Sequence, residues 1–437
     1  MALADRRTLR LGGELVWVGL GQGLAALGAL VGVRVMTGLL PPAHYGEVVL
    51  GMTVALLAQQ VFFSPAYHTA FRFYSSAAQK GTLPVLLAAS RRLTFRSIGW
   101  MTAAGIAGGI LLALTGQTRW LPLLGLAALY AIVTGAGSVF DGFQSAARHR
   151  PVVALHEAGA QWLRFLLAAG VITWLGATSA AAVLGFALSS VVIFISQYLF
   201  FRAKIRPPGP ESADPAEVRG ELARMLPYGL PFAAWGLFTW LHQSSDRWSL
   251  QVTQSTETVG LYAALFQIGY YPMAFFSQIM TQWTAPHLFK QAGDASDPVA
   301  LARARRANRL LVAITLLATV LGAGLALAFH GIIFSILVAA PYREVSPLLP
   351  LMVLAGGLFG AGQAASLLHM SFADSRILVK PKIVTALLGI GFNLAGARYL
   401  GLKGVVLGMV AFGIVYCLWL LLAFRAGREK VAAPDAT

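Results

Sequence analysis

Charged residues are scarce in this chain, at 11% of 437 residues, whereas a soluble domain usually carries about 25%. Apolar residues make up 57% of the chain, and the mean hydropathy of +0.70 requires many apolar segments. Each crossing of a hydrocarbon core about 30 Å thick uses about 20 residues. The composition therefore excludes a soluble protein and indicates a polytopic membrane protein.

Cysteine and catalytic motifs are also lacking. The single cysteine, Cys417, lies in an apolar run, so neither a disulfide framework nor a cysteine-based metal site is available. No P-loop, HExxH, GxSxG or CxxC motif occurs, which leaves an ATP-driven pump or a hydrolase without support. The loops are short, so any chemistry takes place in the membrane. We expect no catalytic residues, no metal site and no cofactor.

Twelve apolar stretches of roughly 20 residues fit membrane-spanning helices. They lie at 14–38, 46–70, 97–116, 120–143, 152–175, 180–201, 227–251, 260–285, 309–331, 347–370, 383–400 and 404–424. The first lacks a convincing cleavage site after its apolar run, which indicates an uncleaved helix. The predicted fold is an all-α polytopic membrane protein with about twelve transmembrane helices.

Basic residues are distributed asymmetrically between the loops. If the N-terminus lies inside, 26 of the 33 lysine and arginine residues fall on the cytoplasmic side, as the positive-inside rule requires. This asymmetry accounts for the net charge of +16 without a nucleic-acid partner. It predicts a multi-pass protein of the cell inner membrane with both termini in the cytoplasm.

A proline-rich polar connector divides the predicted helices six and six. We expect an N-terminal lobe at 1–206, a flexible cytoplasmic linker at 207–224 and a C-terminal lobe at 225–437. Short patterns repeat in the two halves: Arg34 precedes Gly46 as Arg247 precedes Gly260, and Leu175-Gly176 precedes Val183-Leu184-Gly185 as Leu400-Gly401 precedes Val406-Leu407-Gly408. Parallel six-helix repeats place a binding cavity between two lobes in many secondary transporters.

The stretch at 152–175 contains polar residues that are costly in hydrocarbon. Glu157, Gln161 and Arg164 are spaced i, i+4 and i+7 and share one helix face. Arg164 falls near the bilayer midplane, too deep for its side chain to extend to the water at the membrane interface. One interpretation is a buried anion-binding site with a carboxylate neighbour. The alternative is an ion pair that only orders the helix bundle.

Two further helices carry polar side chains. Asp246 and Arg247 end the stretch at 227–251, where they form either part of the site or an anchor at the membrane interface. Gln267, Tyr271 and Gln278 form a neutral polar stripe on the next helix. Amides and phenols suit sugar hydroxyls, which both donate and accept hydrogen bonds. The alternative for this stripe is hydrogen bonding between helices.

Several segments resemble bacterial polysaccharide flippases, which belong to the multidrug, oligosaccharidyl-lipid and polysaccharide exporter (MOP) superfamily. The similar segments are Tyr228-Gly229-Leu230-Pro231, Trp240-Leu241, Ser244-Ser245-Asp246-Arg247, Val259-Gly260-Leu261-Tyr262, Leu39 to Gly46, and Asn393-Leu394 followed by Gly401-Leu402-Lys403-Gly404. The resemblance implies translocation of an undecaprenyl-pyrophosphate-linked oligosaccharide to the periplasmic leaflet by alternating access, for O-antigen or exopolysaccharide assembly. It also implies membrane lipids, a polysaccharide polymerase and a chain-length regulator as partners, and no enzymatic activity.

The chemistry of such a substrate assigns roles to the polar residues. Arg164, Arg34 and Arg247 would bind the pyrophosphate, and Gln161, Gln267, Tyr271 and Gln278 the sugar. Glu157 or Asp246 would bind a proton or Na⁺ if transport is coupled to an ion gradient.

Two alternatives stay open. A drug/cation antiporter of the same superfamily would favour acidic over basic cavity residues, and a membrane polymerase or ligase would need a large periplasmic loop. A lipid II flippase is disfavoured because such proteins usually have fourteen helices.

Overall fold

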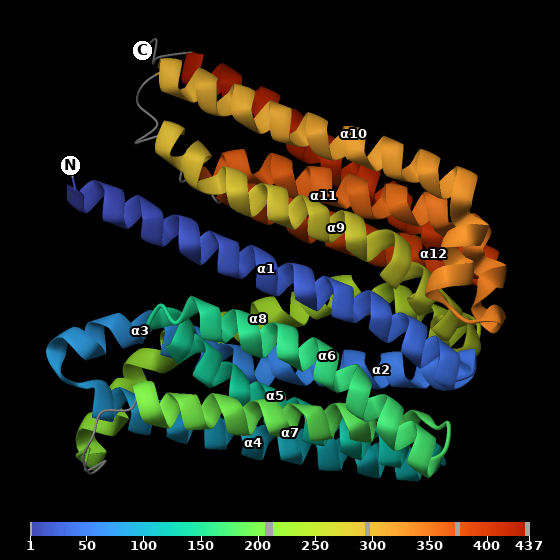
Figure 1. Ribbon diagram of the computed structural model, residues 1–437, viewed down its shortest axis with the longest axis horizontal. Helices are drawn as coiled ribbons and strands as arrows, with labels where there is room; N and C mark the ends of the chain where they lie inside the picture. Colours follow the sequence, from blue (N-terminus) through green and yellow to red (C-terminus); the bar gives the residue numbers. More distant parts are fainter. Residues whose placement is uncertain (1, 206–212, 293–297, 372–375, 433–437) are drawn as a thin grey trace. The chain divides into compact units, whose positions relative to one another are not determined.

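A computed structural model describes residues 2–205, 213–292, 298–371 and 376–432, and every regular element in these ranges is helical (Figure 1). Residues 206–212, which include the first part of the linker predicted at 207–224, lie outside the described part, as do the side chains of Arg6, Arg7 and Arg10. By its contacts the chain divides into two units, residues 1–240 and 241–437.

The first unit contains seven α-helical segments and the start of an eighth within its described residues. They are α1 (Ala2–Leu39), α2 (Pro42–Ala58), α3 (Ser64–Lys80), α4 (Leu83–Leu114), α5 (Leu121–Ala146), α6 (Arg150–Leu175), α7 (Ser179–Lys204) and the first part of α8 (Pro215–Thr253). A π-helical turn at Gln59–Phe63 joins α2 to α3, so these two form one long helix. A 3₁₀ turn at Thr118–Trp120 precedes α5.

The second unit contains the end of α8 and four more helical elements in its described residues. They are α9 (Thr256–Ala292), α10 (Pro298–Leu337), α11 (Leu349–Ser371) and α12 (Arg376–Ala432), with a 3₁₀ segment at Ala340–Leu348 before α11. Gly401 interrupts α12 with φ 59° and ψ −139°, so α12 is two helices. When α2 and α3 are counted as one helix and α12 as two, the described chain has twelve long helices. Each of them covers one of the twelve predicted stretches, and no predicted stretch extends more than two residues beyond its helix. The predicted fold class is confirmed.

Ten helical segments of the described chain are long and apolar enough to cross a membrane. The more polar α8 is not among them, and the two halves of α12 count as one segment. The chain is therefore a multi-pass membrane protein. Most helices extend beyond the predicted stretches; α4, for example, begins at Leu83 rather than at 97. The physical reason is that the hydropathy window detects only the apolar part of a helix.

Proline and glycine set most helix boundaries. α2, α4, α5 and α6 each have proline in their first turn, where its missing N–H costs no hydrogen bond. Gly81 ends α3 with φ 72°. The linker is shorter than predicted, because α8 begins at Pro215 and makes residues 215–224 helical. The contact boundary also lies within α8, between Trp240 and Leu241, since Val218, Leu222 and Met225 pack into the core of the first unit.

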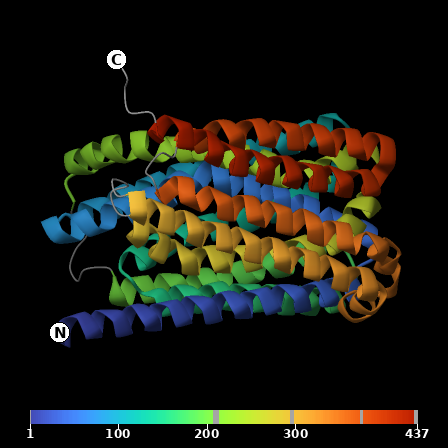
Figure 2. The same cartoon turned by 90° about the horizontal axis from the view of Figure 1, so that it is seen from above.

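One helix is central in each unit. In the first unit α5 contacts α2, α3, α4, α6 and α7, and in the second unit α11 contacts α9, α10 and α12. Figures 1 and 2 both show α9 to α12 lying side by side. Close approach needs small residues: a Cβ on Gly135 of α5 would meet the Phe63 ring, and one on Gly357 of α11 would meet Thr319.

The repeated glycines occupy equivalent turns. Gly176 lies between α6 and α7 with φ 102°, and Gly401 lies between the halves of α12 with φ 59°. A Cβ added at Gly185 would meet the backbone of Ala168 on the preceding helix, and one at Gly408 the backbone of Phe392. Both helix pairs therefore cross at a glycine after a left-handed turn, as expected for an internal repeat.

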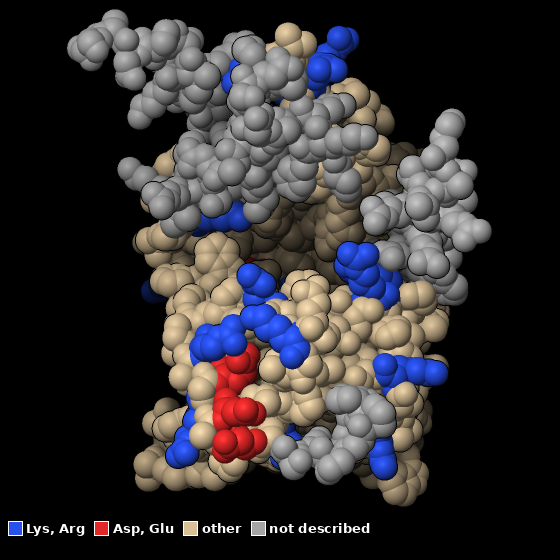
Figure 3. Space-filling view, turned by 90° about the vertical axis from the view of Figure 1, so that its left-hand side faces the viewer, with Lys and Arg blue, Asp and Glu red and all other residues tan. Residues whose placement is uncertain are grey.

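Basic side chains gather at one end of the first unit. Lys80, Arg148, Arg150 and Lys204 lie where α3 meets α4, where α5 meets α6, and at the end of α7. Figure 3 shows lysine and arginine side chains on this end, with acidic side chains grouped beside some of them. This is the end predicted to face the cytoplasm.

Candidate functional site

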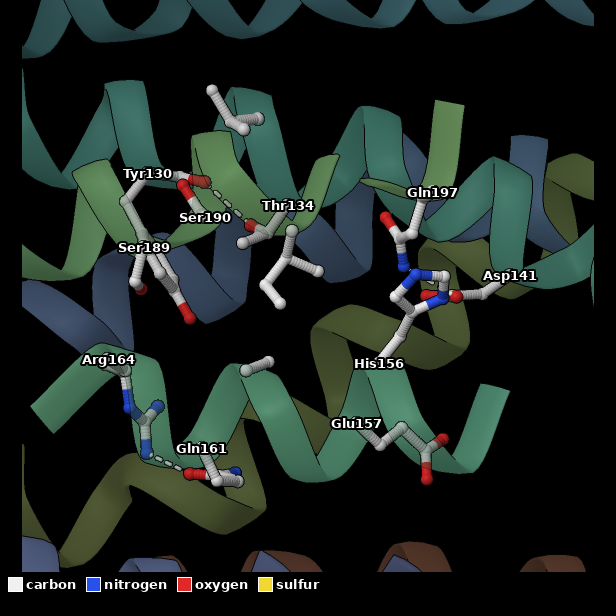
Figure 4. A pocket seen from close by; sticks show the side chains of 13 residues that line it. Tyr130, Thr134, Asp141, His156, Glu157, Gln161, Arg164, Ser189, Ser190 and Gln197 are labelled. Atoms are coloured by element: carbon white, nitrogen blue, oxygen red, sulfur yellow. Dashed lines mark hydrogen bonds between the residues drawn. The ribbon is translucent and has the colours of Figure 1, made fainter. Parts of the chain in front are cut away.

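A cavity of about 170 Å³ lies within the first unit between α5, α6 and α7 (Figure 4). Polar and charged side chains from all three helices line it. They are Tyr130, Thr134 and Asp141 of α5, His156, Glu157, Gln161 and Arg164 of α6, and Ser189, Ser190 and Gln197 of α7, together with Val133, Ala160 and Ile193.

Helix α6 supplies the charged wall. Arg164 Nη2 donates a hydrogen bond of 2.6 Å to Gln161 Oε1, one turn earlier. The guanidinium also lies over the rings of Phe165 and Phe186, at 4.7 and 5.2 Å, which is the geometry of a cation–π contact. Its buried Nε has no hydrogen-bond partner within the described residues. Contacts with Gln161 and the two rings therefore hold the cation in place without neutralising its charge.

The carboxylates lie at the other end of the cavity from Arg164 (Figure 4). Gln197, which is buried, donates a hydrogen bond of 2.7 Å from Nε2 to Asp141 Oδ1. Glu157 lines the same cavity from α6 and is exposed. His156 places Nε2 3.0 Å from Ser196 Oγ. In the described chain no ion pair joins Arg164 to either carboxylate, so the cavity contains separate cationic and acidic ends.

Hydroxyl groups line the wall between these ends. Thr134 Oγ1 donates to the carbonyl of Tyr130 at 2.7 Å and accepts a bond of 2.6 Å from Gln59 Nε2. Ser189 and Ser190 donate to the carbonyls of the preceding turn of α7. A hydroxyl that donates to its own helix can still accept from a ligand. The cavity can therefore bind an anion at Arg164 and polar, uncharged groups along α5 and α7.

Asp246 and Arg247 form a separate cluster in the second unit. Arg247 Nη1 lies 3.2 Å from Asp246 Oδ1, and Tyr262 Oη donates to Asp246 Oδ2 at 2.6 Å. Asp246 is buried, and the guanidinium of Arg247 lies 4.5 Å from the Phe266 ring centroid. Each charge here already has a partner, unlike the charge on Arg164. This arrangement favours the anchoring interpretation for Arg247, while its binding role stays a prediction.

The other predicted residues lie outside the cavity. Arg34 is exposed on α1, near its end at Leu39. Gln267 and Tyr271 are half-buried on α9 of the second unit, and Gln278 on the same helix is exposed. Of the nine predicted residues, the structure brings Glu157, Gln161 and Arg164 together around one cavity.

Sequence reasoning missed the residues that α5 and α7 contribute. Ser190 and Gln197 are spaced i and i+7 on α7, with Ser189 beside Ser190. Glu157 and Arg164 have the same spacing on α6, so this pattern could have identified the wall that α7 forms. Asp141 falls near the end of the predicted stretch at 120–143, where a solvated carboxylate is the ordinary expectation. Only the packing of α5 against α7 shows that Gln197 reaches it.

No family model and no curated protein matches this chain, whereas solved structures do. An inward-facing multidrug resistance MATE family transporter of the MOP superfamily is 16% identical, with TM-score 0.64 and coverage of 93% of this chain and 96% of that one. The lipid II flippase MurJ, in an inward closed conformation, is 12% identical, with TM-score 0.67 and coverage of 94% and 87%. A MOP superfamily transporter from Pyrococcus furiosus Vc1 is 17% identical, with TM-score 0.53 and coverage of 97% of this chain and 95% of that one. For that transporter, the reverse polarity of the binding pocket suggests a different function. The chain therefore has the two-lobed helical fold of MOP superfamily transporters.

Proposed function

We propose that this protein is a membrane transporter that flips an undecaprenyl-pyrophosphate-linked oligosaccharide across the inner membrane for O-antigen or exopolysaccharide synthesis. The observation that carries the proposal is the cavity of the first unit, in which Arg164 presents a charge with no carboxylate partner among the described residues. A flippase of lipid-linked sugars must hold a pyrophosphate in a medium of low dielectric constant, and arginine is the side chain best suited to that group.

The rest of the cavity suits a saccharide. Gln161, Tyr130, Ser189 and Ser190 line the space next to Arg164, and amides and hydroxyls match the donor and acceptor pattern of sugars. The polyprenyl tail would stay in the bilayer, so only the anionic and sugar groups need protein contacts. The fold shared with the lipid II flippase MurJ supports a role in moving a lipid-linked molecule. A polymerase and a chain-length regulator would use the translocated unit.

Loss of the protein tests this function. A strain lacking it should accumulate the completed undecaprenyl-linked unit in the cytoplasmic leaflet, beyond the reach of periplasmic probes. An assembly enzyme would behave differently, because its loss leaves an incomplete unit or unpolymerised units on the periplasmic face. Finding completed units accessible from the periplasm at normal levels would rule out the flippase.

A drug/cation antiporter is the second candidate, and Asp141 and Glu157 favour it. Both carboxylates line the cavity that contains Arg164, and they would attract a cationic compound. Loss of an antiporter would raise sensitivity to cationic drugs and leave the pool of lipid-linked units unchanged. The same two measurements, drug sensitivity and leaflet accessibility, therefore separate the candidates.

Ion coupling is a further part of the proposal. Glu157 would bind a proton or Na⁺ at the acidic end of the cavity, and Asp246 would do so in the second unit, where Tyr262 and Arg247 already contact it. Transport into vesicles with an imposed pH or Na⁺ gradient tests this. Glu157→Gln should abolish the response to the gradient if Glu157 is the coupling site, and Asp246→Asn should do so if Asp246 is.

A further inference from the structure

A second, smaller cavity opens between three helices of the second unit. It measures about 70 Å³ and lies between α10, α11 and α12. Its lining is apolar apart from two residues at the start of α10, and consists of Asn308, Arg309, Val312, Ala365, Leu420 and Leu421. Asn308 is buried and donates from Nδ2 to the carbonyl of Ala364 at 2.8 Å. This bond fixes α10 to α11 and leaves Arg309 as the charged group at the groove.

The start of α10 is strongly basic. Arg303, Arg306 and Arg309 are spaced three residues apart, so they lie close together on the helix surface, and all three are exposed. Helix α10 has no acidic residue over its 40 residues. Within the described part of the chain these three arginines form no ion pair, so their charges are available to an external anion.

The surface beyond the arginines is apolar. Leu310, Leu317 and Leu321 are 61%, 60% and 59% exposed along α10, which fits contact with lipid chains in a helix long enough to span a membrane. Val312 and Leu421 line the groove itself, on the side of α10 away from these three leucines. The site therefore combines a cationic end with an apolar slot, and this combination matches the two ends of a phospholipid.

We propose that this groove binds an anionic phospholipid, with its phosphate at Arg309 and an acyl chain along Val312 and Leu421. Basic pockets between membrane helices bind anionic headgroups, and each arginine near such a surface contributes about 1 kcal/mol. A zwitterionic lipid carries its own cation and gains less from the three arginines. The lipid is a resident of the second unit, so the proposal does not depend on the transported substrate.

Native mass spectrometry of the purified, delipidated full-length protein measures this binding. Phosphatidylglycerol should bind more tightly than phosphatidylcholine, and Arg309→Gln should weaken phosphatidylglycerol binding about fivefold, the equivalent of one arginine contact. Leu421→Trp should reduce binding of the same lipid by filling the groove while keeping every charge. Elution of each variant as a single species on size exclusion shows that it is folded.

Arg398→Gln is the matched control, since Arg398 is an exposed arginine of the same unit outside the groove. It should bind phosphatidylglycerol as the unmodified protein does. Equal binding of the two phospholipids, or equal losses in the Arg309 and Arg398 variants, would overturn the proposal. So would Arg309-dependent binding of undecaprenyl pyrophosphate in preference to phosphatidylglycerol, because the groove would then belong to the transport substrate.

Discussion

Replacement of Arg164 by alanine should abolish most transport while leaving the protein folded. The guanidinium donates to Gln161 on its own helix and lies over two aromatic rings, but pairs with no carboxylate in the described chain. Breaking a buried ion pair costs about 3–5 kcal/mol because one charge is left behind. Here no partner charge is left, and Arg164 is only half-buried, so we expect a stability loss of about 1 kcal/mol.

The effect on transport should be larger. A hydrogen bond to a charged group contributes about 1.5–3 kcal/mol, which corresponds to a loss of about 10- to 150-fold in affinity for an anionic substrate. Arg164→Lys should recover part of the activity, because lysine keeps the charge and loses the planar fork that binds two oxygens at once.

Flipping of a labelled lipid-linked oligosaccharide in proteoliposomes, read by a probe that cannot cross the membrane, measures both variants. Arg119→Ala is the control, since Arg119 lies over Trp120 before α5, away from the cavity. If Arg164→Ala instead removes the protein from the membrane, the structural interpretation of this arginine is correct and the binding site must lie elsewhere. Unchanged flipping in Arg164→Ala would show that Arg164 does not bind the transported substrate.

Three other experiments test the fold. Asp246→Ala leaves Arg247, whose side chain is 14% exposed, without its carboxylate. It should lower stability by about 3 kcal/mol, the lower end of the range for breaking a buried pair. Tyr262→Phe removes one hydrogen bond and should cost about 1 kcal/mol. Thermal unfolding of the purified variants compares the two, and equal effects would contradict the ion-pair assignment. Gly396→Val would force a side chain against the backbone across the break in α12 and should unfold the protein at lower temperature than Gly391→Val, where nothing lies within 4 Å; similar melting of the two would show that this close approach matters little. A reporter fused after residue 215 should face the cytoplasm, and finding it outside would reverse the predicted topology.

The helices could be predicted because each needs its own apolar stretch to cross the membrane. The ends of the helices could not be predicted, because a helix can continue beyond its apolar stretch. Residues 83–96 of α4 contain Arg91, Arg92 and Arg96, yet they are helical. For the same reason the start of α8 could not be predicted. Residues 215–224 are largely polar and follow a proline-rich segment, yet they are helical. Hydropathy thus located the membrane crossings and underestimated the helical content.

Part of the site could be predicted because it lies on one helix. The spacing of Glu157, Gln161 and Arg164 is fixed by helix geometry alone, and all three line the cavity. The opposite wall depends on which helix packs against which, and no local pattern specifies that Gln197 meets Asp141 across 56 residues. For a cavity formed by several helices, the sequence therefore predicts the residues that share one helix face, but not the residues that other helices contribute.

The π-helical turn at Gln59–Phe63 changes how its helix should be drawn. The amide of Ser64 bonds to the carbonyl of Gln59, five residues earlier, so the turn contains one residue more than an α-helix would. At 3.6 residues per turn, one extra residue rotates everything that follows by about 100°. The buried side of α3, formed by Ala66, Thr69 and Ala70, therefore points about 100° away from the direction that an unbroken α-helix through α2 would give it. A single helical wheel drawn through both segments therefore assigns α3 the wrong face. Deleting one residue from the turn would rotate these small residues by about 100° from their present neighbours.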